Sequence, residues 1–219
     1  MKNRTNFYWY ASPETILETT NSMIIFSAEN FNRALVIERL DELKKMLKDH
    51  KEGLVAPLDF QQFMIPFIFE KVIDLFKVCL FFENYMKAEL MNKGFLIHQV
   101  NKVLNCDELA KKQYNEPVSA RELHDVLEFQ IDKEAKTIFH DALSSQTLTM
   151  KVLLGKKYLE VIDLPIAIAT SLKILVKQRN ELHVISEWTY QMSTAYIGQM
   201  EEIKGFVNKL FASAGQAKP

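Results

Sequence analysis

The sequence FQQFMIPFIFEKVIDLFKVCLFFENYMKAELMNK, residues 60–93, decides the fold of this chain. Asp59 precedes it as a helix cap, Gly94 follows it as a helix stop, and Pro66 is a position where the helix can kink. Its apolar residues recur at helical spacings almost all around the circumference, and a helix of that kind is buried. The pattern therefore predicts the central helix of a bundle, with six side chains in its core: Phe69, Ile73, Phe76, Leu80, Phe81 and Tyr85.

The composition supports a helical protein. The chain has 219 residues, of which 48% are hydrophobic and 25% are charged, as in a globular domain with a sizeable core. Its 6 Gly and 6 Pro are too few for the frequent turns of an all-β sandwich or barrel. We predict an all-α fold, a bundle of about six to eight helices.

Capping signals predict further helices on both sides of the central segment. Ser12 and Pro13 mark one helix start, and Ser119 with Glu122 forms a capping box that opens another. Between them, the polar segment 106–117 is typical of a surface connection. Helices are predicted over residues 28–50, 119–130, 132–143, 166–185 and 187–211.

The sequence contains no linker that would separate two domains. We expect residues 1–58 to form a helical segment that packs on a bundle of residues 59–212. The small and polar residues 213–219 are typical of a disordered tail.

Charge and hydropathy exclude several classes of protein. The net charge of −1, from 27 Lys and Arg against 28 Asp and Glu, leaves only local patches for binding nucleic acid. The best candidate for a membrane span, residues 162–176, is too short, and no signal peptide opens the chain. Cys79 and Cys106 form no disulfide framework, which favours a reducing compartment. We expect a soluble, cytoplasmic protein that does not bind membranes.

The sequence lacks the motifs of metal and cofactor sites. Gly155-Lys156-Lys157 has neither the upstream glycine nor the following Ser or Thr of a phosphate-binding loop. The 5 His and 2 Cys never approach metal-ligand spacing, and no nucleophile-elbow motif occurs. We therefore expect neither a metal ion nor a cofactor.

One segment, SLKILVKQRNELHVISEW (residues 171–188), combines groups that suit phosphate chemistry. Its apolar stripe continues from Leu172 and Leu175 to Arg179, which places an arginine on the face that should be buried. His183 lies four residues later, about 40° around the helix, and Asn180 lies beside them. A guanidinium binds phosphate oxygens in bidentate fashion, and an imidazole moves protons near neutral pH.

The alternative interpretation of this segment is structural. Arg179 would bond a carboxylate or the carbonyls of a helix end inside the bundle, and His183 would be a satisfied neighbour. Lys173 and Lys177 add to a local excess of cations that would hold an anionic ligand, although a solvated face explains them equally well.

Three segments resemble HEPN domains, the all-α domains of prokaryotic toxin–antitoxin, abortive-infection and CRISPR effector systems. LFFENYMKAELMNKGFLIHQVNKVL (residues 80–104) is similar to their first long helix and the following turn. TLTMKVLLG (147–155) and LKILVKQRNELHVIS (172–186) are similar to their C-terminal half, in which an Arg-Asn pair opens the catalytic motif. The resemblance covers roughly residues 64–210.

The resemblance implies a metal-independent endoribonuclease of a toxin or antiviral defence system. Two copies would face each other across a homodimer, and the 2′-hydroxyl of RNA would attack its own phosphate to leave a 2′,3′-cyclic end. Arg179 would stabilise the charged phosphorane, His183 would act as general acid or base, and Asn180 would orient the pair. Lys173 and Lys177 would bind the RNA, and an antitoxin or another protein would be a further partner.

The sequence departs from the family motif in one respect. Only three residues separate Arg179 from His183, fewer than is usual in the family, and Val184 occupies the position where the commonest spacing places the histidine. The alternative function is therefore a non-catalytic HEPN-like module that binds a protein partner or a nucleotide.

Overall fold

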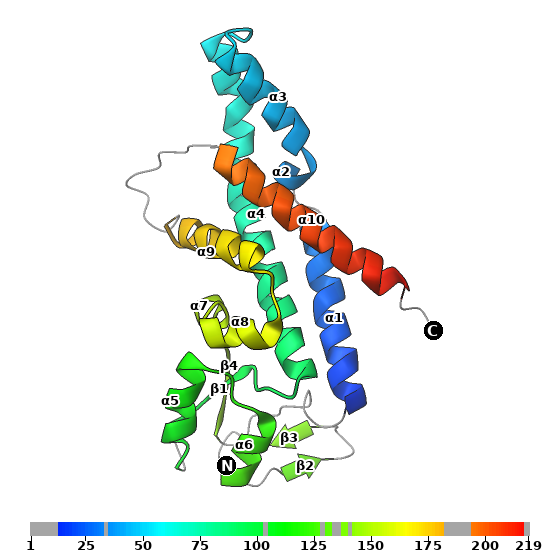
Figure 1. The fold of residues 1–219 in the computed structure, drawn as a ribbon, viewed down its shortest axis with the longest axis vertical. Coiled ribbons are helices and arrows are strands. Elements are labelled where there is room, and N and C mark those ends of the chain that lie inside the picture. Colours follow the sequence, from blue (N-terminus) through cyan, green and yellow to red (C-terminus); the bar gives the residue numbers. More distant parts are fainter. Residues whose placement is uncertain are drawn as a thin grey trace. The chain divides into compact units, whose positions relative to one another are not determined.

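The computed structural model describes residues 13–32, 35–102, 105–127, 130–132, 137–139, 142–181 and 194–216 (Figure 1). Within these residues the fold is all-α, as the composition predicts, and the strands are short and paired only two by two. The elements are α1 (Pro13–Asn32), α2 (Leu35–Glu38), α3 (Leu40–Lys51), α4 (Pro57–Asn92), β1 (His98–Val100), α5 (Asp107–Asn115), α6 (Ala120–Val126), β2 (Gln130–Asp132), β3 (Thr137–Phe139), β4 (Leu143–Thr147), α7 (Met150–Leu153), α8 (Lys156–Ile162), α9 (Ile166–Glu181) and α10 (Thr194–Gln216).

The chain divides into two compact units, which we call the first unit and the second unit. The first unit consists of Met1–Glu29 and Leu80–Leu164, and the second of Asn30–Cys79 and Pro165–Pro219. This differs from the expected division into residues 1–58 and 59–212. Two of the three boundaries fall inside α1 and α4, where the chain passes from one unit to the other within a helix, and the third lies between α8 and α9.

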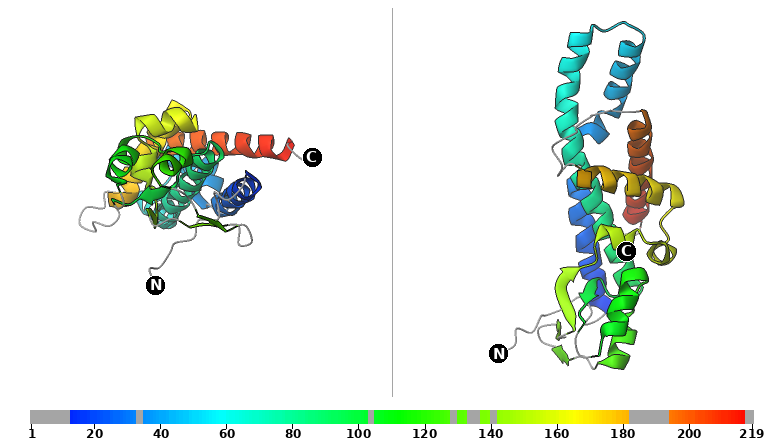
Figure 2. Two further views of the ribbon diagram at one scale, coloured as in Figure 1. Left: turned by 90° about the horizontal axis from the view of Figure 1, so that it is seen from below. Right: turned by 90° about the vertical axis from the view of Figure 1, so that its left-hand side faces the viewer.

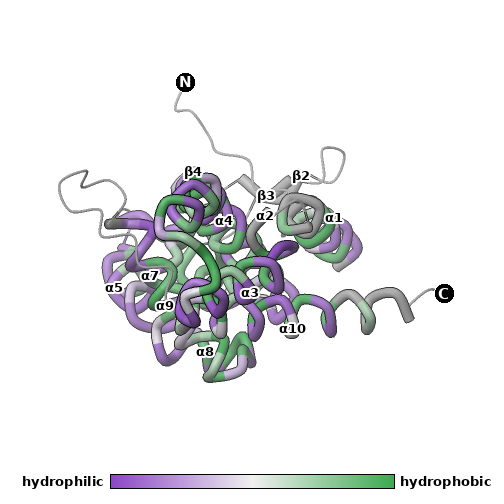
Figure 3. Tube along the Cα trace, turned by 90° about the horizontal axis from the view of Figure 1, so that it is seen from above, coloured by the Kyte–Doolittle hydropathy of each residue, from purple (hydrophilic) through white to green (hydrophobic). Residues whose placement is uncertain are grey.

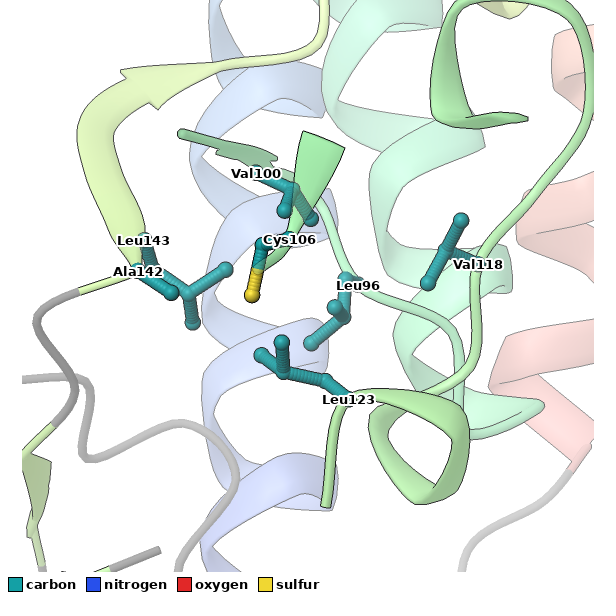
Figure 4. Close-up of a cluster of buried hydrophobic side chains, with 7 residues drawn as sticks. All are labelled: Leu96, Val100, Cys106, Val118, Leu123, Ala142 and Leu143. Carbon is teal, nitrogen blue, oxygen red and sulfur yellow. The ribbon is translucent and has the colours of Figure 1, made fainter. Parts of the chain in front are cut away.

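In the first unit, a core forms around Cys106 at the start of α5 (Figure 4). The prediction that residues 106–117 form a surface connection is wrong, because α5 lies there and Leu109 and Ala110 pack against this core. Thr20 on α1, which is fully buried, donates to Asn92 on α4 at 3.1 Å and joins these two helices. The fully or almost fully buried members of the cluster are Leu96, Val100, Cys106, Val118, Leu123, Ala142 and Leu143.

The helix predicted over residues 132–143 is also wrong. Where the chain is described, β2 pairs antiparallel with β3 and Ile131 lies opposite Ile138, while β4 pairs with β1. The β-branched isoleucines of β2 and β3 favour strands. For β4 the partner strand is β1, which lies more than forty residues earlier in the sequence. Local capping signals cannot report a partner so distant in the sequence.

The capping box at Ser119 is confirmed. The Ser119 backbone N–H donates to the Glu122 carboxylate at 2.8 Å, and the Glu122 N–H donates to Ser119 Oγ at 3.2 Å. The helix that it opens, α6, ends at Val126, earlier than the predicted residue 130.

In the second unit, Asp74 on α4 caps the four-residue helix α2 from a distant position in the sequence. Its Oδ2 accepts a hydrogen bond from the Ile37 N–H at 3.2 Å, and Asp74 is fully buried. Lys204 on α10 donates to the Ile37 carbonyl at 3.3 Å, so both backbone groups of Ile37 are bound by other helices. The single helix predicted over residues 28–50 is therefore divided among α1, α2 and α3.

Helices α3 and α10 pack on this arrangement. The right-hand view of Figure 2 shows α3 beside the first turns of α4, and the rings of His50 and Phe60 stack at 3.8 Å between them. Hydrophobic and hydrophilic residues alternate along α10 (Figure 3), and this helix buries one of its faces. Lys44 on α3 forms an ion pair with Glu201 on α10. Helix α10 begins at Thr194 and continues to Gln216, four residues into the segment expected to be a tail.

Helix α4 covers nearly all of the predicted segment, and Pro66 lies inside it. The predicted cap is wrong, because α4 begins at Pro57 and Asp59 lies in its first turn. The expectation that its apolar residues are all buried is wrong. Phe81 is 1% exposed, but only part of the circumference is covered by the described residues of the chain. Four of the six expected core residues remain exposed: Phe69 at 65%, Ile73 at 47%, Phe76 at 47% and Leu80 at 43%.

Among the described residues, no helix combines the length and the apolar character needed to cross a membrane.

We expect Gln113 on α5 to be essential for the packing of β1. Its Oε1 accepts from the Val100 N–H at 2.7 Å and its Nε2 donates to the His98 carbonyl at 2.8 Å, with Gln113 3% exposed. Gln113→Met keeps the length of the side chain but leaves both buried backbone groups without this partner. The free energy of unfolding in urea should fall by at least about 2 kcal/mol. Tyr114→Met, at a residue 63% exposed, should change it by less than about 0.5 kcal/mol.

Candidate functional site

Helix α9 carries the residues that the sequence singles out for chemistry. It follows Asp163, whose φ of 59° ends α8, and it begins after Pro165 at Ile166. Ile168, Leu172 and Leu175 are at most 3% exposed, so the predicted apolar stripe is buried in the second unit. Ser171 on the same side donates to Glu202 on α10 at 3.0 Å and links the two helices.

Arg179 does not continue this stripe into the core. Its side chain is half-buried, and its Nε and Nη2 donate to Asn180 Oδ1 at 3.3 and 3.2 Å. In the described part of the chain it forms no ion pair with a carboxylate. The structural alternative, in which Arg179 is paired inside the bundle, therefore has no support from the described residues. The reason is that Arg179 lies near the end of α9, where the stripe reaches the surface.

The structure brings Arg179 and Asn180 together but does not describe the third member of the expected site. His183 lies in residues 182–193, outside the described residues, as does the predicted cap at Ser186. Lys173 and Lys177 are exposed and share one face of α9. On a regular helix they lie about 120° and 160° around the axis from Arg179, so the two lysines and the arginine form separate surfaces.

The first unit contains a buried polar cluster that the sequence analysis missed. Lys87 on α4, 5% exposed, contacts Glu83 Oε1 at 2.5 Å and donates to Thr147 Oγ1 on β4 at 2.8 Å. His98 on β1 is 3% exposed, and its Nδ1 lies 3.1 Å from the Ser144 carbonyl. The sequence offered one signal for this cluster. Glu83 and Lys87 are four residues apart, so they meet on one face of the helix and can form an ion pair.

This cluster holds the strand pair against α4. Burial lowers the pKa of His98 to about 4, and the positive charge of Lys87 lowers it further. The hydrogen bond to the Ser144 carbonyl has the opposite effect and raises the pKa, but it is outweighed by burial. His98 is therefore neutral at pH 7. Among the described residues, no group of three or more His, Cys, Asp or Glu side chains is arranged to hold a metal ion.

Comparisons with known proteins add no relative. No family model matches the chain, and neither a curated protein nor a solved structure is similar to it.

We expect His98 to make the stability depend on pH. In the unfolded chain the imidazole has its ordinary pKa of 6.5, whereas the pKa in the fold is about 4. The unfolded state therefore binds more protons between these values, and the free energy of unfolding falls as the pH is lowered through this window, by up to about 3 kcal/mol. Urea unfolding at a series of pH values measures this.

His98→Gln should flatten this dependence between pH 6.5 and 5. Equal slopes in the wild type and His98→Gln would contradict the assignment.

Proposed function

We propose that the C-terminal end of α9 binds and cleaves RNA without a metal ion, as a HEPN-like endoribonuclease of a toxin or antiviral defence system in the cytoplasm. The observation that carries the proposal is the state of Arg179. The residue is half-buried, its guanidinium is bound at the surface to the neutral amide of Asn180, and it has no carboxylate partner among the described residues. An arginine whose charge is not neutralised is suited to bind an anion.

The contact with Asn180 supports phosphate binding in a particular geometry. Asn180 Oδ1 accepts from Nε and Nη2, which holds the planar guanidinium in one orientation and leaves Nη1 for a ligand. Arginine stays charged at all physiological pH values and matches pairs of phosphate oxygens. Arg179 would therefore stabilise the additional negative charge that develops on the phosphorane.

His183 supplies the proton transfer in this proposal. The 2′-oxygen forms a bond to phosphorus as its proton passes to a base, and the bond to the 5′-oxygen breaks as that oxygen receives a proton. One imidazole is suited to each transfer, and a homodimer would supply two. Lys173 and Lys177, on their separate exposed face, would bind the RNA backbone away from the scissile bond.

A second candidate is a non-catalytic HEPN-like module that binds a nucleotide or a protein such as an antitoxin through the same arginine. The observation that favours it is the short spacing, since only three residues separate Arg179 from His183.

The decisive experiment is incubation of the purified full chain with total RNA and tRNA in EDTA. We expect cleavage that leaves 2′,3′-cyclic phosphate ends and that is lost in Arg179→Ala and in His183→Ala. Arg121→Ala, which removes an exposed arginine from α6, should cleave like the wild type. Absence of cleavage together with RNA binding that requires Arg179 would favour the binding module, and absence of both would reject the site.

The stability of Arg179→Ala separates a binding role from a structural one. Because Arg179 is half-buried and unpaired with any carboxylate among the described residues, its removal should change the free energy of unfolding by less than about 0.5 kcal/mol. An arginine in a buried pair would instead cost about 3–5 kcal/mol. Chemical denaturation followed by circular dichroism measures the difference, and a loss in the larger range would refute the proposed role.

A further inference from the structure

Helix α4 carries an apolar surface that the second unit leaves in contact with water. Between residues 65 and 76, every exposed residue is apolar. The large side chains Ile65, Phe69, Ile73 and Phe76 follow one another at steps of four, four and three and therefore lie along one face of the helix. Their exposed fractions are 48%, 65%, 47% and 47%. We call these four residues the α4 stripe.

The charged residues of the same segment all lie on other sides of the helix, where they contact other parts of the second unit. Glu70 binds Arg39 at 3.1 Å, and Asp74 accepts from the Ile37 N–H. Lys71 lies over the ring of Tyr196 at 4.5 Å from its centroid. A helix that faces water normally turns its charges outward and its apolar residues inward. Here the charged side chains contact the rest of the second unit and the apolar side chains face water. This reversed pattern indicates that the apolar face of α4 packs against a partner.

The area of the stripe suits an interface between two copies of the chain. With about 200 Å² for a large apolar side chain, the exposed fractions correspond to about 400 Å² of apolar surface on each copy. Two copies would bury about 800 Å² of apolar surface. If polar residues around the stripe make up the remaining share of about 40% of the interface, as they do on average, the total is about 1,300 Å², within the range of stable complexes.

The order of residues along the stripe is self-complementary. If two α4 helices pack antiparallel about a two-fold axis between Phe69 and Ile73, each Phe69 lies opposite Ile73 of the second copy. Ile65 then lies near Phe76 of the second copy, so every phenyl ring meets an isoleucine. No charge is placed against a like charge, because the stripe contains none.

We propose that the α4 stripe is the interface of a two-fold symmetric homodimer in which two α4 helices pack antiparallel. The same face repeats on both subunits, as in most closed dimers. The proposal rests on the stripe alone and stands whether or not Arg179 and His183 cleave RNA.

Sedimentation equilibrium of the full chain tests the dimer. The wild type should be dimeric at micromolar concentration, and Phe69→Asp should raise the dissociation constant by about 100-fold or more, because it places a charge at the centre of the interface. Ile73→Glu should have the same effect. Ile166→Asp, at a residue of α9 that is 85% exposed, is the matched control and should remain dimeric. Circular dichroism confirms that each variant is folded.

Disulfide cross-linking tests the antiparallel arrangement. A mixture of Phe69→Cys and Ile73→Cys chains should form the mixed disulfide faster than either chain forms a disulfide with itself, while the native Cys79 and Cys106 are buried. A monomeric wild type, or a dimer that Phe69→Asp leaves intact, would overturn the proposal. So would preferential self-linking at position 69, which indicates parallel helices, or a monomer that binds lipid vesicles through the stripe.

Discussion

Asp74 and the two charged residues before it determine which side of α4 the second unit covers. Asp74 binds the Ile37 N–H, Lys71 contacts the Tyr196 ring, and Glu70 pairs with Arg39. A buried carboxylate or ammonium without such contacts would be costly, so these three positions must face the rest of the unit. Once they do, the rotation of α4 about its axis is set, and the apolar residues between them are turned to the outside.

The same principle explains why α9 is a better candidate for a ligand site than the first unit. In the first unit the buried cations and imidazoles are bound by protein groups, as Lys87 is by Glu83 and Thr147. On α9, Arg179 has only the neutral amide of Asn180 as its described hydrogen-bond partner. A positive charge that the fold does not neutralise is available to an external anion. The two units therefore differ in whether their cations are paired, and this difference does not depend on a sequence motif.

Signals that act within one turn of a helix could be predicted from the sequence. The capping box of Ser119 and Glu122 forms as expected, because both partners are three residues apart. The extent of α4 and the buried stripe of Ile168, Leu172 and Leu175 were also predictable, since both depend on helical periodicity. The position of Arg179 was not, because periodicity places it on the buried face but cannot tell where that face reaches the surface.

The sequence by itself therefore determined that this protein is all-α, where its longest helix runs, and which residue types stand at the end of α9. Only the tertiary structure decided that Cys106 and α5 belong to a core, that residues 130–147 contain strands, and that Phe69 and Ile73 are exposed. The reason is physical. Helix formation and capping depend on neighbours within four residues, whereas burial and strand pairing depend on partners that lie tens of residues away.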